Sequence, residues 1–109
     1  MTLETLKEKC EEEGFKYAFG KFTEKVEPPY LIATIIDSTN FYADNIVYYQ
    51  HLNVSLDLAT LKKEIKLQKK IEDNILSDIT WAKEEGILAD AEVYITSYFF
   101  ELEEYKNES

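Results

Sequence analysis

The sequence has 109 residues, of which 45% are apolar, 14% aromatic and 31% charged, a composition typical of one folded domain and not of a disordered chain. Its net charge is −10 and all twelve basic residues are lysine, so the chain repels phosphate backbones and lacks the arginine fork that reads guanine. These properties argue against sequence-specific nucleic-acid binding.

Cys10 is the only cysteine, so no disulfide can form within the chain and a reducing compartment is expected. The N-terminal residues lack the basic, apolar and small-residue pattern of a secretory signal. No apolar run approaches the length of a membrane span. We therefore expect a protein of cytosolic type that does not contact a membrane.

The first third of the chain predicts a helix and then an edge strand. Thr2 can cap a helix that ends near Glu13, with Gly14 after it and with three apolar residues on one face: Leu3, Leu6 and Cys10. Residues 15–22 then alternate as an edge strand does. Pro28 and Pro29 close the polar segment that follows, because proline cannot occupy a central strand.

Two strands are predicted in the middle of the chain. Residues 30–36 are apolar on both faces, which indicates a buried strand, and the turn-forming residues 37–40 are expected to end it. A second strand begins near Asn45. Its end, residues 51–58, shows the clearest alternation in the sequence, with leucine and valine at every even position.

The main helix is predicted over residues 61–77, with Thr60 as its cap. Its apolar stripe consists of Leu61, Ile65, Ile71 and Ile75. We expect Leu61, Ile65 and Ile75 to contact the core residues Leu52, Val54 and Leu56. Another face carries a basic stripe of Lys62, Lys66, Lys69 and Lys70. The first three follow the spacing i, i+4, i+7 and are expected to project together.

The last third predicts two more strands. Residues 79–83 form a short one, 84–90 a loop or a single helical turn, and 92–102 a long strand. The acidic residues 103–109 are expected to fray. The order α-β-β-β-α-β-β over residues 1–109 predicts a single α+β domain, with a twisted, mostly antiparallel sheet of four or five strands and helices packed on one face.

The inventory of catalytic groups is small, and we expect no enzyme, no cofactor and no metal site. His51 is the only histidine and falls on the wet face of its strand, so we interpret it as a surface residue. Cys10 falls on the apolar stripe of the first helix, where a thiol acts as a small hydrophobe. Asp and Glu total 22, so no single carboxylate pair is informative. No glycine-rich phosphate loop is present.

The lysine stripe is the most informative charged feature. Such a stripe is often only the wet face of a helix. In a chain of net charge −10, however, it also complements the acidic surfaces of another copy, which suits head-to-tail self-association. Apolar contact area would come from aromatic residues such as Tyr30, Tyr94 and Tyr98.

Several segments follow one another over most of the chain: FKYAFGKF, then EPPYLIATIIDSTNFYADNIVYYQ, LNVSLDLAT, LKKEIKLQKKIEDNIL, Trp81 with Lys83, and VYITSYFFELE. In the second segment, a Pro-Pro-Tyr entry into a strand is followed by Asn40, Phe41, Ala43, Asp44 and Tyr48. In this order and spacing they resemble small tail-completion or tail-terminator proteins of bacteriophages with long, non-contractile tails. One departure is Leu58-Ala59-Thr60, where relatives often have Leu-Tyr-Thr.

The resemblance implies a structural protein of the virion head-tail junction, present in the host cytoplasm during assembly. It implies a ring, commonly a hexamer, that caps the tail tube protein and joins it to the head-completion or connector protein. An acidic surface without arginine is compatible with a channel through which DNA slides.

Two alternatives come from other classes of protein. An acidic inhibitor that mimics DNA would also be small and non-catalytic, although the lysine-rich helix interrupts the acidity. A small enzyme that uses carboxylates is the third possibility, and the absence of a tuned group of residues counts against it.

Overall fold

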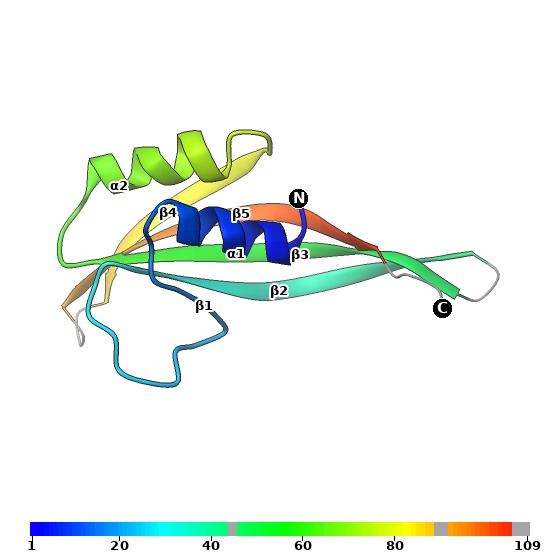
Figure 1. Cartoon of the computed structure of the whole chain (residues 1–109), viewed down its shortest axis with the longest axis horizontal. Coiled ribbons are helices and arrows are strands. Elements are labelled where there is room, and N and C mark those ends of the chain that lie inside the picture. Colours follow the sequence, from blue (N-terminus) through cyan, green and yellow to red (C-terminus); the bar gives the residue numbers. More distant parts are fainter. Residues whose placement is uncertain (44–45, 89–91, 106–109) are drawn as a thin grey trace.

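The structure, a computed structural model, describes residues 1–43, 46–88 and 92–105, and it describes side chains in these ranges except at 39–49 and 105. The predicted order of elements is confirmed (Figure 1). The elements are α1 (Leu3–Glu12), β1 (Tyr17–Phe19), β2 (Tyr30–Ala43), β3 (Ile46–Thr60), α2 (Ile65–Lys70), the π-type turn η1 (Ile71–Ile75), β4 (Trp81–Leu88) and β5 (Val93–Tyr105).

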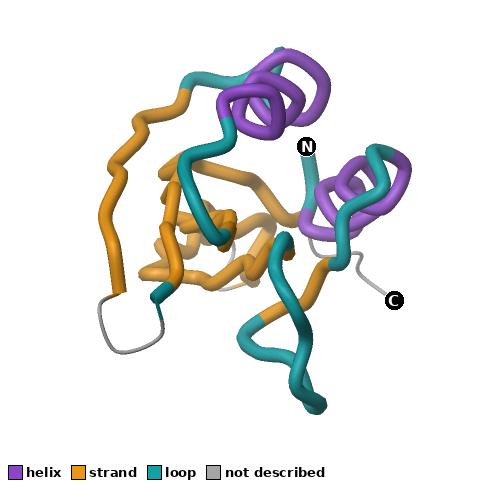
Figure 2. Tube along the Cα trace, turned by 90° about the vertical axis from the view of Figure 1, so that its left-hand side faces the viewer, coloured by secondary structure: helices purple, strands orange, loops and turns teal. Residues whose placement is uncertain are grey.

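The five strands form one sheet in the order β1-β2-β3-β5-β4. β1 runs parallel to β2, and the other neighbours are antiparallel. Both helical segments lie on the same side of the sheet (Figure 2). This arrangement confirms the predicted α+β class, with a mostly antiparallel sheet and helices on one face.

The helix α1 follows its prediction closely. The backbone N–H of Thr5 donates to the Thr2 hydroxyl oxygen at 3.1 Å, so Thr2 caps the helix as expected. Gly14 adopts a φ of 86° just after the helix, a conformation that favours glycine. Cys10 is buried, and burial together with the nearby Glu11 carboxylate raises the pKa of its thiol to about 12. The thiol is therefore a packing group and not a reactive one.

The core lies between the helices and one face of the sheet. The even-numbered residues of β3 from Leu52 to Leu58 are all buried, as the alternation predicted. β5 contributes Thr96, Tyr98, Phe100 and Leu102 to the same face. From the helical side, the cluster is completed by Leu6, Cys10, Ile71, Ile75 and Leu76.

The strand β2 is longer and more exposed than the sequence predicted. The expected turn at residues 37–40 is wrong, because these residues pair with 50–53 of β3 after a bulge between Ile35 and Asp37. The Asn53 amide also donates to the Asp37 carboxylate. Burial on both faces is wrong as well: Leu31 and Ala33 are buried, whereas Thr34 and Ile36 on the other side are exposed.

The main helix is shorter than predicted, because strand pairing extends into its expected first turn. Thr60 pairs with Tyr94 as the last residue of β3, and its hydroxyl donates to the carbonyl oxygen of Lys62 at 2.6 Å. α2 therefore begins only at Ile65. The expected contacts of Leu61 and Ile65 with the core are also wrong, since the two residues are 74% and 61% exposed.

The end of this helix widens into η1. The backbone N–H of Leu76 donates to the carbonyl oxygen of Ile71 at 2.9 Å, a hydrogen bond that spans five residues. Ile71, Ile75 and Leu76 are all fully buried. The wider turn thus brings two adjacent residues, Ile75 and Leu76, into contact with the sheet, which a regular helix could not do equally well.

Two further predictions need correction at the C-terminal strands. β4 continues through residues 84–88, expected to be a loop, because they pair with Val93–Ser97 of β5; residues 89 and 90 of that predicted loop lie outside the described residues. β5 continues to Tyr105, where fraying was expected, because residues 103–105 pair with β3. The remaining residues of the predicted tail, 106–109, are also outside the described part.

The hairpin of β2 and β3 projects beyond the rest of the sheet (Figure 1). Its pairing runs to Ala43 and Ile46, whereas β5 accompanies β3 only as far as Tyr49. The molecule is accordingly elongated, with extents of 50 × 27 × 23 Å. Of the residues that support the phage resemblance in this hairpin, Asp44 and the side chains of Asn40, Phe41, Ala43 and Tyr48 are outside the described part.

Candidate protein-interaction surface

No helix among the described residues covers the face of the sheet opposite α1 and α2, and we call it the open face. Only at one end does the segment before β2 lie against it, where Phe22 packs on Tyr30. The strand register arranges its side chains in rows across β2, β3, β5 and β4. One row is Ile32, Asp57, Ser97 and Glu84; the next is Thr34, Ser55, Phe99 and Ala82; the third is Asp37, Asn53 and Glu101. The open face therefore alternates two acidic rows with an uncharged one that contains Phe99.

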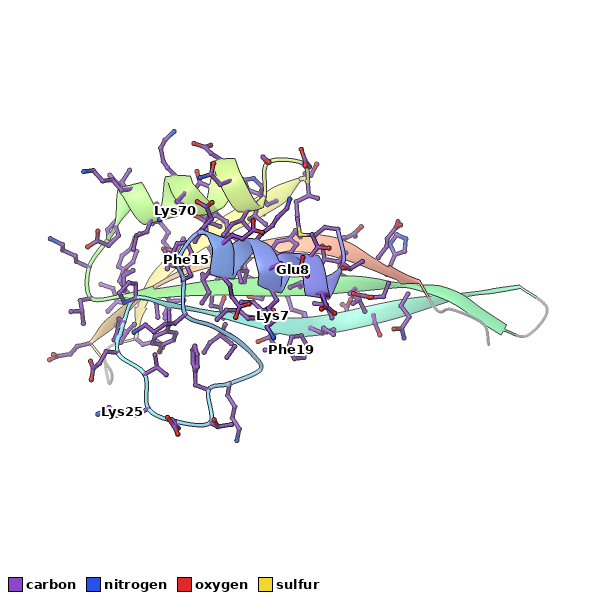
Figure 3. The ribbon with its side chains drawn as sticks, viewed as in Figure 1. Lys7, Glu8, Phe15, Phe19, Lys25 and Lys70 are labelled. Carbon is purple, nitrogen blue, oxygen red and sulfur yellow. The ribbon has the colours of Figure 1, made fainter. Side chains whose placement is uncertain are left out.

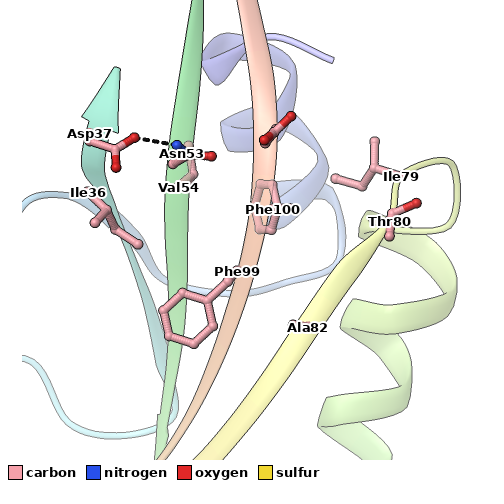
Figure 4. Close-up of a pocket in the computed structure, with 10 residues that line it drawn as sticks. Ile36, Asp37, Asn53, Val54, Ile79, Thr80, Ala82, Phe99 and Phe100 are labelled. Carbon is pink, nitrogen blue, oxygen red and sulfur yellow. Dashed lines mark hydrogen bonds between the residues drawn. The ribbon is translucent and has the colours of Figure 1, made fainter. Parts of the chain in front are cut away.

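A hollow of about 700 Å³ lies on the open face around Phe99 (Figure 4). Ile36 and Phe99 form its apolar floor, and Ala82 and Thr80 continue it toward β4. The carboxylates of Asp37 and Glu101 stand at its border. An apolar floor with a carboxylate border suits a lysine side chain, whose stem is apolar and whose end is cationic.

A second hollow, of about 510 Å³, lies toward the other end of the open face. Ile32, Ala59 and Ile95 provide apolar area, and Asp57 and Glu84 flank Ser97 between them. The two carboxyl-bearing residues stand on strands two positions apart in the sheet, about 10 Å from each other. This hollow therefore has the same chemistry as the first.

No lysine occurs among the described residues of these rows, whereas they carry four carboxylates. Next to them, His51 lies 3.8 Å from the Glu101 carboxylate and 3.3 Å from that of Glu103. The three rows are thus acidic where they are charged, and Lys25 borders the open face beside Tyr30 and Ile32. Its exposed apolar side chains make it a candidate for protein contact and not merely a solvated surface.

The predicted lysine stripe is only partly formed. Lys66 and Lys69 lie one turn apart on α2 and are exposed, but Lys62 lies in the segment before the helix, so the three do not share a helical face. In the described part of the chain, none of the three forms an ion pair. Other lysines do have partners: Lys63 pairs with Glu85, and Lys83 pairs with Glu72. Lys70 donates a hydrogen bond to the carbonyl oxygen of Glu13.

The free lysines are accompanied by exposed apolar residues. Leu61 precedes Lys62, and Ile65 begins α2 beside Lys66. We call Leu61, Lys62, Ile65, Lys66 and Lys69 the basic end. Here α2 is anchored by Lys70, whose ammonium lies 5.6 Å from the centre of the Phe15 ring (Figure 3). The basic end is therefore an exposed, cationic and apolar surface on a fixed helix.

The three tyrosines predicted to make contacts have different environments. Tyr30 is half-buried on the open face and packs edge-on against Phe22 at 5.3 Å between ring centres. Tyr94 is half-buried, and its hydroxyl donates to the Glu85 carboxylate at 2.9 Å. The prediction for Tyr98 is wrong: it is fully buried in the core, because its strand position faces the helices.

Glu85 joins the start of the helical segment to β4 and β5. Its carboxylate accepts hydrogen bonds from the Gln68 amide at 2.7 Å and from the Tyr94 hydroxyl, and the Lys63 ammonium lies at 3.1 Å. The hydrogen bonds from Gln68, Lys63 and Tyr94 lower the pKa of Glu85 to about 2. This group of residues holds α2 in place, and we interpret it as structural.

We expect Glu85→Gln to reduce the acid sensitivity of folding. The ordinary pKa of the carboxyl is 4.5 and the folded value is about 2, so its charge stabilises the fold fully above about pH 4.5. That contribution is lost as the pH falls from about 4.5 toward about 2. Urea unfolding at about pH 5 and about pH 3 measures the free energy of unfolding of both proteins. The wild type should exceed Glu85→Gln in this free energy by less at about pH 3 than at about pH 5.

The neighbouring Glu84→Gln is the matched control, because the Glu84 carboxylate makes no hydrogen bond or ion pair within the described ranges. Its stability difference from the wild type should stay nearly constant between the two pH values. An equal acid dependence for both variants would show that Glu85 has no special role in the fold.

Among the described residues, no group of three His, Cys, Asp or Glu side chains is placed to hold a metal ion. No helix in the same residues combines the length and the apolarity that a membrane crossing requires.

Two features of the candidate surface were missed from the sequence: the hollows of the open face and the exposure of Leu61 and Ile65. Apolar residues such as Ile36 and Phe99, at positions that alternate with the core, were the available signal. No protein-family model matches the chain, and no curated protein matches it either.

Proposed function

We propose that the chain is a structural assembly protein that acts by binding other protein subunits through its open face. The observation that carries this proposal is the apolar floor of that face, where Ile36 is 55% exposed beside Phe99. Apolar area left exposed beside polar residues marks contact sites in proteins. Together with the resemblance stated above, this favours a tail-terminator role at the head-tail junction of a virion.

The projecting hairpin supports the same proposal. A two-stranded hairpin without neighbours is only marginally stable in water. Beyond Tyr49, β2 and β3 have no further strand beside them in the described part of the chain. A partner subunit that packs against this pair would stabilise it. In the proposed role, the partners are the tail tube protein, the connector and other copies arranged as a ring.

The proposal predicts that Ile36→Asp prevents capping of tail tubes. An added charge on the apolar floor must be desolvated on contact, and we expect binding to weaken about tenfold or more. The measurement is electron microscopy of tubes assembled from a phage tail tube protein, with and without the chain. Wild type should bind tube ends and fix tube length, and the variant should not.

Phe19→Asp is the matched control. Phe19 is 52% exposed, nearly as much as Ile36, but β1 pairs it with Ala33, a position on the helical side. This variant should cap tubes as the wild type does. Equal capping by both variants would contradict the use of the open face. If the chain instead leaves the tubes uncapped and displaces duplex DNA from a DNA-binding protein, the role is that of an acidic DNA mimic.

A further inference from the structure

We propose that the basic end of one copy docks on the open face of the next copy. The inference rests on the proposed function, because it names the occupant of the face through which subunits are proposed to assemble. Two observations support it independently. The lysines of the basic end have no ion-pair partner in the described part of their own chain, and the rows of the open face carry carboxylates without lysine.

The apolar parts of the two surfaces also match. Leu61, just after β3, and Ile65, the first residue of α2, are 74% and 61% exposed, and both stand next to lysines. The hollows offer them Phe99 and Ile36 at one end of the open face, and Ile32 and Ile95 at the other. Docking would remove apolar area on both copies from water while each ammonium reaches a carboxylate.

The spacing of the acidic rows suits several lysines at once. Asp57 and Asn53 are four residues apart on β3, so the row with Asp57 and Glu84 lies about 13 Å from the row with Asp37 and Glu101. Lysine side chains are long and flexible, and their stems can lie over Phe99 and Ala82 in the uncharged row between the two. Lys66 and Lys69, one turn apart, can therefore engage carboxylates of the same face.

The geometry of such a contact has a consequence for assembly. The basic end and the open face consist of different residues of one chain and meet only where Leu61 borders Tyr30 and Ile32. Each copy therefore uses one surface toward one neighbour and the other toward the next. Such a heterologous contact generates a closed ring, or a filament if the rotation does not close. The proposal thus gives the ring a specific junction, in which the lysines of the basic end meet the carboxylates of the open face.

A charge exchange tests the junction. The variant Lys62→Glu/Lys66→Glu/Lys69→Glu reverses the basic end, and Asp57→Lys/Glu84→Lys/Glu101→Lys reverses the open face. By sedimentation at low salt, the wild type should form multiples of its 12.8 kDa monomer, and either variant alone should need about tenfold or more concentration to do so. Mixed together, the two variants should assemble, because each then offers the surface that the other requires.

The control variant Lys7→Glu/Lys9→Glu/Lys21→Glu makes the same change in net charge away from the basic end and should assemble like the wild type. Circular dichroism verifies that every variant is folded. A wild type that stays monomeric at low salt, a basic-end variant that assembles normally, or a mixture that does not assemble would each overturn the proposal. If the wild type caps tubes but the two charge-reversed variants do not assemble when mixed, only this junction is rejected. If the mixed variants assemble but the wild type does not cap tubes, only the phage role is rejected.

Discussion

Replacing Tyr98 with alanine should lower the free energy of unfolding by about 3–5 kcal/mol, as expected for truncation of a large, fully buried aromatic side chain. The ring packs edge-on against Trp81, with 5.4 Å between ring centres and an interplanar angle of 76°. Its hydroxyl donates to the Glu72 carboxylate at 2.8 Å. The variant removes both the packing and this hydrogen bond, and urea unfolding measures the loss.

Tyr98→Phe separates the two contributions. It keeps the ring and removes only the hydroxyl, so the cost should be about 1–2 kcal/mol. Burial alone would raise the pKa of Glu72, but the hydrogen bonds from Lys83 and Tyr98 outweigh it and keep that pKa below its ordinary value. The Lys83 ammonium lies 2.9 Å from the Glu72 carboxylate and still pairs with it in the variant, which limits the loss of stability. A loss below about 1 kcal/mol for Tyr98→Ala would instead indicate an exposed residue.

The sequence predicted those features of the fold that are determined within a single helix or strand. The alternation of Leu52 to Leu58 identified the core face of β3 because side chains of a strand point to opposite sides in turn. Thr2 and Gly14 marked the ends of α1 for an equally local reason, a side-chain cap and a positive φ. Neither inference required knowledge of another segment.

The errors arose where a distant segment decided the conformation. Thr60 is a good helix cap, but Tyr94 pairs with it and keeps it in the sheet. Residues 37–40 have turn chemistry, yet β3 supplies hydrogen-bond partners for an extended backbone. Glu84 and Glu85 are poor strand formers that β5 holds in register. Sequence propensities differ by about 1 kcal/mol at most, so tertiary pairing overrides them.

The candidate surface was predictable only in its chemistry. Free lysines and surface tyrosines were expected, and Lys66, Lys69 and Tyr30 are indeed accessible or partly accessible. Helices on one face were predicted, but the exposed apolar hollows of the opposite face were not, because apolar residues on both sides of β2 were interpreted as burial on both sides. Whether a helix covers a given sheet face depends on how many helices the chain provides. Here both helical segments occupy the same side, and Ile36 remains exposed.

A pair of single substitutions distinguishes the observed fold from the one that the helical stripe predicts. Leu56 is fully buried beneath the helices, so Leu56→Ala should lower the free energy of unfolding by about 2–5 kcal/mol. Ile65 was expected in the same core, but it is exposed in the structure. Ile65→Ala should therefore change stability by less than about 0.5 kcal/mol.

Both variants are best measured by urea unfolding at low protein concentration and high salt, where self-association through the basic end does not contribute to stability. The slope of the unfolding free energy against urea should stay unchanged, which would show that only stability has altered. A cost of 2 kcal/mol or more for Ile65→Ala under these conditions would place Ile65 in the core. The helix would then begin near Thr60, and the basic end would lose one of its two apolar residues.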